Sequence, residues 1–327
     1  MARSVSPFAA RVAVLGALVL ALSMIAPTTS AAPGDRRGNR STTSTLTVVT
    51  YNAGAQVRPS RTMGDLASIF RRNPDIVTLQ EMSSGEKRKR VRERYLDCAR
   101  CVWDAHMPVP PVPGGTPVLW RSDRLRLVGY GTEQVTRATY VGNAGAGPAT
   151  IRPKYVNWVR LRDLRSGRLV HVLNNHTVPS VQGKDGGPNR RMHKRLGIYR
   201  KHMAGLQGLV REIHEQYASS LVFVTGDLNV NYRRDRVLAP SLFPYRRLGD
   251  VGLRASYRAL GEPRNGTHTL RSGNSKRLID HVYYLPRRSL VPSRQRILTG
   301  LSSDHRPLLV SFAVKNRRAW VPPEGRS

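Results

Sequence analysis

Short runs of apolar, β-branched residues recur along this chain and constrain its fold more than any other feature of the sequence. Runs of this length, bounded by polar or turn-forming residues, are typical of β-strands. Seven segments have this character: residues 46–51, 75–80, 155–161, 169–174, 220–225, 277–284 and 307–313. Three segments read as helices: residues 63–71, 86–94 and 189–217. Several strands for each helix favour an α/β (α+β) β-sandwich flanked by helices over a doubly wound sheet, in which strands and helices alternate.

The longest helical segment, residues 189–217, carries one apolar stripe. The stripe recurs at spacings of three and four residues: Leu196, Tyr199, Met203, Leu206, Val210, Ile213 and Tyr217. A stripe of this kind packs against the core of a protein, here against a sheet. The sequence contains no repeat of fixed period and no linker that would divide the strands into two sets. We therefore expect one domain.

The N-terminus has the pattern of a secretory signal peptide. Arg3 and Arg11 flank the start of an apolar run over residues 12–26, and small residues up to Ala31 provide a cleavage site. The run is shorter than the ~20 residues of a membrane span, although an uncleaved anchor stays open as an alternative. We expect a secreted chain without stable membrane association. It divides into a signal peptide (1–31), a disordered leader (32–45), the domain (46–315) and a basic tail (316–327).

The balance of charge is strongly basic. Lys and Arg number 54 against 21 Asp and Glu, a formal net charge of +33, and only eight of the cations are lysine. Arginine makes planar, two-pronged contacts with phosphate, and cationic residues cluster at 87–94 and 190–201. Such a charge indicates a polyanionic partner, either nucleic acid or an anionic membrane surface. A bias towards arginine codons would explain the excess of arginine over lysine, but not the shortage of acids.

Cys98 and Cys101 are the two cysteines of the chain. Two thiolates cannot form a four-thiolate zinc site, and no nearby histidine pair completes one. In an exported protein we expect a structural disulfide that closes a tight surface loop. A redox-active pair is the alternative, but the flanking residues do not resemble a thioredoxin-like unit.

Polar side chains capable of chemistry stand beside the predicted strands. They are Asn52, Glu81, His176, Asp227, Asn229, Asp280, Asp304 and His305. Each alone is ordinary, because a single carboxylate after a strand is usually solvated and a single histidine is usually only hydrogen-bonded. Together they supply the groups that hydrolyse a phosphodiester with a hard cation. Carboxylate oxygens bind Mg²⁺, amides donate to phosphate oxygens and histidines transfer protons.

The motifs that contain these residues resemble the endonuclease/exonuclease/phosphatase superfamily. The resemblance extends over residues 46–312, and its motifs follow the family's order: TYNAG, DIVTLQE, NNHT, TGDLN, LIDHV and SDHRP. This superfamily includes pancreatic-type deoxyribonuclease, abasic-site endonucleases, inositol-polyphosphate phosphatases and bacterial sphingomyelinases. The resemblance implies a deoxyribonuclease-like fold, a four-layer β-sandwich flanked by helices, and a metal-dependent phosphodiesterase.

The resemblance also implies a metal site. Glu81 is similar to the family's metal-binding glutamate, and Asn52 and Asp304 would lie beside the same ion. The expected ion is Mg²⁺, with Mn²⁺ and Ca²⁺ left open.

The resemblance implies catalytic roles for the remaining motif residues. His305 is similar to the general base that accepts a proton from the attacking water, and Asp280 would hold its imidazole in the correct tautomer. Asp227 and Asn229 match the pair that orients the nucleophile and the phosphate. His176 matches the histidine near the leaving group, a candidate general acid or phosphate donor.

Other positions are less determined. The cation that contacts the scissile phosphate could be Arg152 or Lys154, since the spacing does not choose between them. We expect His193 and His268 to be structural or exposed.

The core motifs do not decide the substrate. The basic clusters and export favour a monomeric nuclease acting on DNA or RNA, because contacts to the phosphate backbone dominate non-specific affinity for nucleic acid. A sphingomyelinase-like enzyme or a phosphoinositide phosphodiesterase or phosphatase is the runner-up, but we see no exposed aromatic tip suited to a lipid surface. A non-catalytic, basic nucleic-acid-binding protein is the third possibility, and its expected mark, a broken set of core residues, is absent from the sequence.

Overall fold

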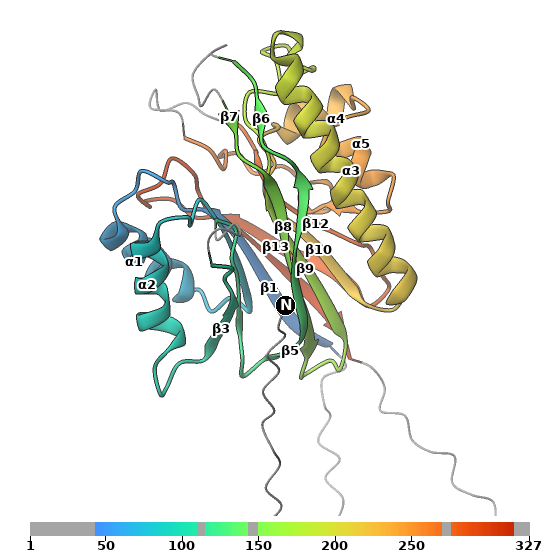
Figure 1. The fold of residues 1–327 in the computed structure, drawn as a ribbon. Helices are drawn as coiled ribbons and strands as arrows, with labels where there is room; N and C mark the ends of the chain where they lie inside the picture. The colour runs from blue at the N-terminus through green and yellow to red at the C-terminus, as the bar shows by residue number, and fades with distance from the viewer. Residues whose placement is uncertain (1–42, 110–114, 143–149, 270–275, 317–327) are drawn as a thin grey trace, which may run out of the picture. The chain divides into compact units, whose positions relative to one another are not determined.

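The computed structural model describes residues 43–109, 115–142, 150–269 and 276–316 (Figure 1). The chain divides into two units, residues 1–40 and 41–327, and every described residue belongs to the second. The predicted signal peptide and its cleavage point near Ala31 therefore lie outside the described residues, as do most of the leader and all but one residue of the basic tail.

The first of two large sheets has six strands in the order β13-β14-β1-β2-β4-β3. Its central strand β1 (Thr43–Asn52) is parallel to β2 (Ile76–Gln80) and antiparallel to β14 (Leu308–Lys315). The outer strands are β13 (Leu290–Ile297), β4 (Val118–Arg121) and β3 (Trp103–His106).

The second large sheet also has six strands, in the order β11-β12-β10-β9-β8-β5. In its centre β9 (Leu169–His176) and β10 (Leu221–Asp227) are parallel. Their antiparallel neighbours are β8 (Lys154–Asp163) and β12 (Asp280–Tyr284). The edge strands are β5 (Leu125–Thr136) and β11 (Arg254–Ala255), and β6 (Thr139–Tyr140) and β7 (Thr150–Ile151) form a separate ribbon.

The two sheets pack face to face because successive side chains of a strand point to opposite sides. In β1, Leu46 and Val48 belong to the core between the sheets, together with residues of β10 such as Phe223. Val49 and Tyr51 belong to a second core on the other face. Continuous apolar runs in the central strands reflect this burial on both faces.

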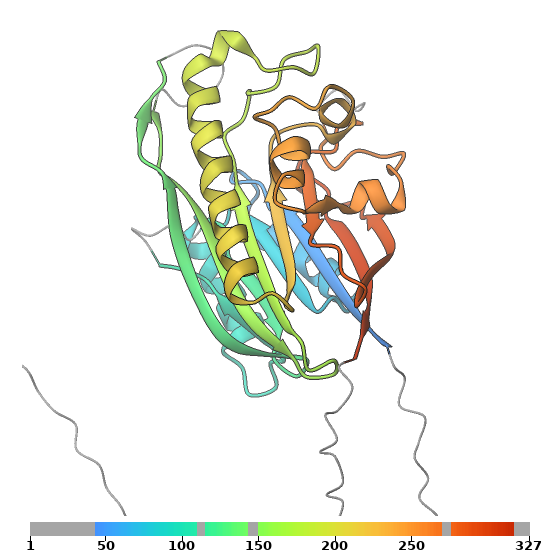
Figure 2. The same ribbon diagram turned by 90° about the vertical axis from the view of Figure 1, so that its right-hand side faces the viewer.

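Helices cover the outer faces of both sheets (Figures 1 and 2). On the first sheet, α1 (Pro59–Phe70) and α2 (Gly85–Val91) contribute Leu66, Ile69 and Val91 to the second core. On the second sheet, the long helix α3 (His193–Gln216) packs along β5 and β8 through its predicted stripe. The short helices are α4 (Tyr232–Leu238), α5 (Pro244–Gly249) and α6 (Ser256–Leu260). The order helix–sheet–sheet–helix confirms the four-layer sandwich.

Several element boundaries differ from the prediction. β1 begins at Thr43, so residues 43–45, predicted as leader, belong to a strand that pairs with β14 as far as Lys315. α1 begins four residues earlier than predicted, at Pro59, where proline's fixed φ suits the first turn of a helix. After α2 the chain continues as a π-helical turn over Arg92–Leu96, and a 3₁₀ turn over Arg190–Met192 precedes α3.

Two further predictions concern the cysteines and the membrane. Cys98 and Cys101 are joined in a disulfide, with Cα atoms 5.1 Å apart, as expected of the structural pair. None of the helices in the described part of the chain is long and apolar enough to cross a membrane.

Candidate active site

The topology brings the predicted site residues to one edge of the sandwich. β1 and β2 are parallel, so Asn52 and Glu81 stand at the same end of the first sheet, and His176 and Asp227 stand likewise at the ends of β9 and β10. β12 runs antiparallel to β10, and its first residue, Asp280, lies opposite Asp227. Residues 303–305 lie just before β14, which is antiparallel to β1. Strand directions therefore gather the site residues at one end of each sheet, and the packing of the sheets brings the two ends together.

Asn52 connects the two sheets. Its Nδ2 donates to Oε1 of Glu81 at 3.3 Å and to Oδ2 of Asp227 at 3.1 Å, and its Oδ1 accepts the amide of Gly54 at 3.0 Å. The side chain is fully buried. Its amide therefore fixes one carboxylate from each sheet relative to the other.

Two non-glycine residues of the site have left-handed backbone conformations, Glu81 with φ 59° and Asn229 with φ 54°. Such conformations are unfavourable for side chains other than glycine and often occur at functional positions. Glu81 is held by the backbone amide of Ala55, which donates to its Oε2. The backbone amide of Asn229 donates to Oδ1 of Asp227 at 2.9 Å. Its side-chain Nδ2 donates to the backbone carbonyl of Thr177 at 3.4 Å. Both side chains are thus fixed at sharp turns after strands.

His305 and Asp280 form the closest ion pair of the site. Nδ1 of His305 lies 2.8 Å from Oδ2 of Asp280, and its Nε2 lies 3.7 Å from Oδ2 of Asp227. The histidine is 6% exposed and Asp280 is fully buried. Burial disfavours the imidazolium, but the surrounding carboxylates, Asp280 first among them, outweigh it and raise the pKa of His305. Burial also raises the pKa of Asp227.

Asp304 reaches the site through its neighbour Ser303. The Ser303 hydroxyl donates to the carbonyl of Asn52 at 2.8 Å and lies 3.4 Å from Oδ1 of Asp304. The Asp304 side chain is 45% exposed. The carboxylate of Asp304 is therefore partly open to solvent and is linked through Ser303 to the backbone of Asn52.

His176 lies beside the same carboxylate oxygen of Asp227 as His305. Its Nε2 is 3.4 Å from Oδ2 of Asp227, and its side chain is 20% exposed. Burial and the nearby ammonium of Lys154 lower the pKa of His176 well below its usual value. A neutral imidazole in this position can donate one hydrogen bond through Nε2.

The structure distinguishes the two candidate cations. Arg152 is exposed, whereas Nζ of Lys154 donates to the carbonyl of Thr177 at 3.3 Å. Burial lowers the pKa of Lys154, and the charges of Asp227 and Glu81 act against this. Lys154 is therefore the cation that lies beside the site.

The basic cluster predicted over residues 87–94 is not exposed at its first residue. Lys87 is 1% exposed, and its Nζ donates to the carbonyls of Gly54 at 2.5 Å and Ala55 at 3.5 Å. An ammonium satisfied by backbone carbonyls supports the loop after β1. The neighbouring Lys89 is exposed, with 67% of its side chain accessible.

His268 is a site residue that sequence reasoning missed. Its Nε2 lies 3.9 Å from Oδ2 of Asp304, and its ring meets that of His305 edge to face, with centroids 4.9 Å apart. Burial lowers the pKa of His268 to about 4. The two neighbouring threonines hold this loop in place. The Thr267 hydroxyl accepts a hydrogen bond from the backbone amide of Asp280 at 3.1 Å, and the Thr269 hydroxyl donates to the backbone carbonyl of Asp304 at 2.9 Å. A lone histidine in a polar loop carries no sequence signal of this contact.

The carboxylates of Glu81 and Asp304 are both linked to Asn52. Its side-chain amide donates to Glu81, and its backbone carbonyl accepts the hydroxyl of Ser303, which lies 3.4 Å from Asp304. Carboxylate oxygens suit a hard divalent cation such as Mg²⁺. Two clusters of three potential ligand atoms lie within 4.8 Å: Asp227, Asp280 and His305, and His268, Asp304 and His305. Nδ1 of His305 is engaged by Asp280, and Glu81 belongs to neither of these clusters.

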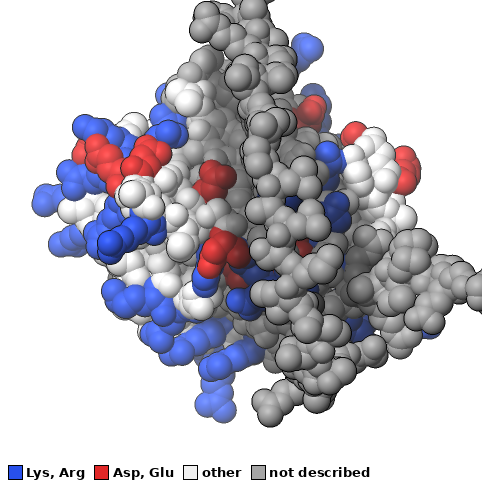
Figure 3. All heavy atoms as spheres, turned by 90° about the horizontal axis from the view of Figure 1, so that it is seen from below, with Lys and Arg blue, Asp and Glu red and all other residues white. Residues whose placement is uncertain are grey.

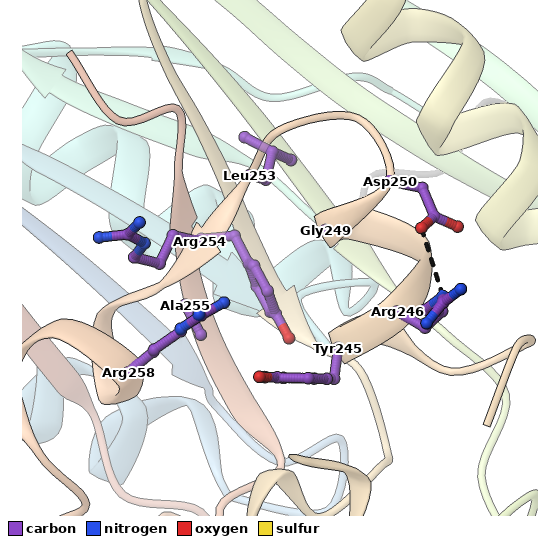
Figure 4. Close-up of a pocket in the computed structure, with 9 residues that line it drawn as sticks. Tyr245, Arg246, Gly249, Asp250, Leu253, Arg254, Ala255 and Arg258 are labelled. Carbon is purple, nitrogen blue, oxygen red and sulfur yellow. Dashed lines mark ion pairs between the residues drawn. The ribbon is translucent and has the colours of Figure 1, made fainter. Parts of the chain in front are cut away.

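Hollows elsewhere on the molecule do not contain the site. The hollow in Figure 4, about 240 Å³, lies between α5, β11 and α6. Arg246 and Asp250 on its rim form an ion pair at 3.5 Å, and Arg254 and Arg258 extend from the opposite side. It includes none of the eight predicted site residues, whereas a hollow of about 420 Å³ includes Asp304.

The family model described as "Endonuclease/Exonuclease/phosphatase family" matches residues 49–305. The chain belongs to this family. The match begins within β1 and ends at His305, so it spans all eight predicted site residues. No curated protein sequence matches the chain significantly.

Solved structures of the family share this fold. An endonuclease/exonuclease/phosphatase family protein from Bacteroides thetaiotaomicron superposes with a TM-score of 0.60 at 18% identity, covering 83% of this chain and 96% of its own. D. rerio TDP2 complexed with single strand DNA product gives 0.58 at 14% identity, covering 82% and 99%. A mannosyl-6-phosphatase from Bacteroides thetaiotaomicron gives 0.58 at 18% identity, also covering 82% and 99%.

Proposed function

We propose that this chain is a secreted, metal-dependent phosphodiesterase that hydrolyses nucleic acid. The observation that carries the proposal is the buried Asp280–His305 pair, 2.8 Å apart and beside Asp227. Asn52 links Asp227 to Glu81, and Asp304 groups with His305 on another side. A family hydrolase of phosphate esters needs a base, an orienting carboxylate and a hard-cation site. The residues at this edge of the sandwich are our candidates for these roles.

The chain's own residues would divide the reaction among them. Asp280 holds Nδ1 of His305, so Nε2 is the atom that accepts a proton from the attacking water. Asp227 lies 3.7 Å from that nitrogen and is fixed by the amides of Asn52 and Asn229, so it orients the water between them. Nucleophile and base are thereby held in one geometry before substrate binds.

The phosphate would bind near His176 and Lys154. His176 offers a ring N–H beside Asp227, and Lys154 offers positive charge. Preorganised donors of this kind stabilise charge that develops on the phosphate in the transition state. Since the pKa of His176 is well below its usual value, we assign it as a phosphate donor and not as a general acid.

A divalent cation held by Glu81 and Asp304, with Asn52 beside them, would supply positive charge at the phosphate and would favour the neutral form of His305. We propose Mg²⁺, because carboxylate and amide oxygens are hard ligands.

Charge supports nucleic acid as the substrate. The net charge is +33. Figure 3, which views the side where β1 begins, shows lysine and arginine side chains mainly on its left and lower parts, with some acidic side chains between them. Electrostatic contacts to the phosphate backbone provide most non-specific affinity. The similar structure of D. rerio TDP2 is complexed with single strand DNA product. The signal-like N-terminus supports secretion.

The proposal is tested by incubating the secreted form of the chain with a panel of substrates. Plasmid DNA, linear DNA and RNA are incubated with Mg²⁺ and with EDTA, next to sphingomyelin, a phosphoinositide and a hexose 6-phosphate. We expect Mg²⁺-dependent cleavage of nucleic acid by the wild type and none by His305→Ala. Nucleic-acid binding without cleavage by the wild type would make the chain a binding protein. Hydrolysis of a lipid or sugar phosphate alone would replace the nuclease by a phosphatase or lipid phosphodiesterase.

A further inference from the structure

The hollow that includes Asp304 adjoins the proposed cation ligands. Its volume is about 420 Å³, and its lining is Gln56, Val57, Arg58, Arg61, Ser302 and Asp304. Ser302 directly precedes Ser303, the residue whose hydroxyl connects Asn52 to Asp304. A group bound in this hollow would therefore lie next to the group that is cleaved.

Two arginines provide the positive charge of this hollow. Arg58 directly precedes α1 and Arg61 lies in its first turn, which contains no acidic residue. Both are exposed, and none of the ion pairs between described residues involves either of them. The acid nearest in the helix, Asp65, is buried, and it accepts hydrogen bonds from the Tyr51 hydroxyl at 2.7 Å and the Ser302 amide at 3.0 Å. Both guanidinium groups are thus available to an anion.

The loop that carries the first of these arginines is tied to the catalytic residues. The amide of Gly54 donates to Asn52, and the amide of Ala55 donates to Glu81. Gly54 has φ 64°, and a Cβ added there would lie 3.0 Å from the hydroxyl of Ser303. The loop therefore packs closely against Ser303. These contacts fix the position of the hollow relative to the proposed cation ligands.

We propose that Arg58 and Arg61 bind a phosphate of the substrate adjacent to the phosphate that is cleaved. The planar fork of arginine matches phosphate oxygens and is charged at every working pH. A small phosphodiester or a sugar phosphate has no second phosphate to place there. The hollow therefore selects a polynucleotide strand over a small phosphate ester, an inference that rests on the proposed nuclease function.

The test compares two substrates of the full secreted chain. One is a single-stranded oligonucleotide, and the other is bis(4-nitrophenyl) phosphate, a diester without a flanking phosphate. In Arg58→Ala/Arg61→Ala we expect KM for the oligonucleotide to rise about tenfold and kcat to change less than twofold, with the small diester affected less than twofold. The slope of log Kobs for oligonucleotide binding against log salt should become shallower by about 0.7, the value for one phosphate contact on a single strand.

Two further variants make the result specific. Arg126 lies at the start of β5, and Arg288 follows the end of β12; both are exposed and lie away from the strand ends that carry the site. Arg126→Ala/Arg288→Ala should therefore leave KM unchanged. Arg58→Lys/Arg61→Lys keeps the charge and should retain the salt slope while recovering part of the affinity. Equal losses on both substrates, or an unchanged KM and salt slope for the oligonucleotide, would overturn the inference. If the wild type cleaves no nucleic acid, the proposed function fails first, and the two failures are distinguishable.

Discussion

Replacing Asp280 by asparagine is expected to lower kcat about 10³-fold. The carboxylate lies 2.8 Å from Nδ1 of His305, and both groups are buried, so solvent cannot substitute for the lost charge. Asparagine has the same size, but its neutral amide cannot stabilise the imidazolium that forms when His305 accepts a proton. General-base catalysis contributes about 10²- to 10⁴-fold, and a 10³-fold loss corresponds to about 4 kcal/mol of transition-state stabilisation.

The same substitution has two further readouts. Asp280 is fully buried behind His305, so KM for an oligonucleotide should stay within about twofold of the wild type. Asp280 is also the foremost group that raises the pKa of His305. Removing its charge lowers that pKa, so the acidic limb of the pH–rate profile should move to lower pH. Steady-state kinetics between pH 5 and 9 measures all three quantities.

The control is a double-mutant cycle. Since Asp280 acts through His305, Asp280→Asn should add almost nothing to the loss already caused by His305→Ala. Asp235→Asn removes another fully buried carboxylate, on α4, and should leave kcat within about twofold, which separates the site from a general effect on folding. Independent, additive losses in the cycle would refute the reasoning.

Three further predictions concern stability. A Cβ at Gly226 would lie 1.9 Å from the carbonyl oxygen of Asn175 in the paired strand, so Gly226→Ala should lower the free energy of unfolding by about 4 kcal/mol or more in urea titrations. Lys87→Met leaves the carbonyl of Gly54 without its buried donor, and unfolding measurements should show a loss of about 1–3 kcal/mol, together with reduced kcat because the loop beside Glu81 is freed. Burial raises the pKa of Asp235 from 3.8 to about 7. The folded chain therefore retains a proton that the unfolded chain has released, and stability should fall between about pH 4 and 7 by up to about 1.4 kcal/mol per pH unit. Asp235→Asn should flatten this dependence, and an equally steep fall in the variant would show that other groups cause it.

The central strands could be predicted because they are buried on both faces. β10 begins with the apolar run Leu221–Val224, and the stripe of α3 predicted the length of that helix to within a turn. The edge strands were missed for the opposite reason. β5 alternates with exposed polar residues and contains Gly129 and Gly131, and β13 contains Pro292 beside an irregularity in its pairing. Their pairing partners, and not their own composition, make them strands.

The site was predictable where residues stand at strand ends. Strand direction places Asn52 with Glu81 at one end of the first sheet, and His176 with Asp227 at one end of the second. The contact between Asn52 and Asp227 depends in addition on how the two sheets pack. Contacts made by loops were not predictable, because they depend on packing between distant segments. Lys87 looked like one more surface cation, and His268 looked like an exposed loop residue. Burial of the first, and the contact of the second with Asp304, exist only in three dimensions.

Dependence on a divalent cation at Glu81 tests the central claim most directly. Cleavage of a fluorescent oligonucleotide is followed during titration with Mg²⁺ after treatment with EDTA, for the wild type and for Glu81→Gln. The substitution keeps the shape of the side chain but removes its charge, and the amide of Ala55 can still donate to the remaining oxygen. We predict no cleavage by the wild type in EDTA, full recovery with Mg²⁺ or Mn²⁺, and a rate for Glu81→Gln lower by orders of magnitude at every concentration. Cleavage at the full rate in EDTA, or wild-type activity in Glu81→Gln, would contradict the assignment of this edge of the sandwich as a metal-dependent phosphodiesterase site.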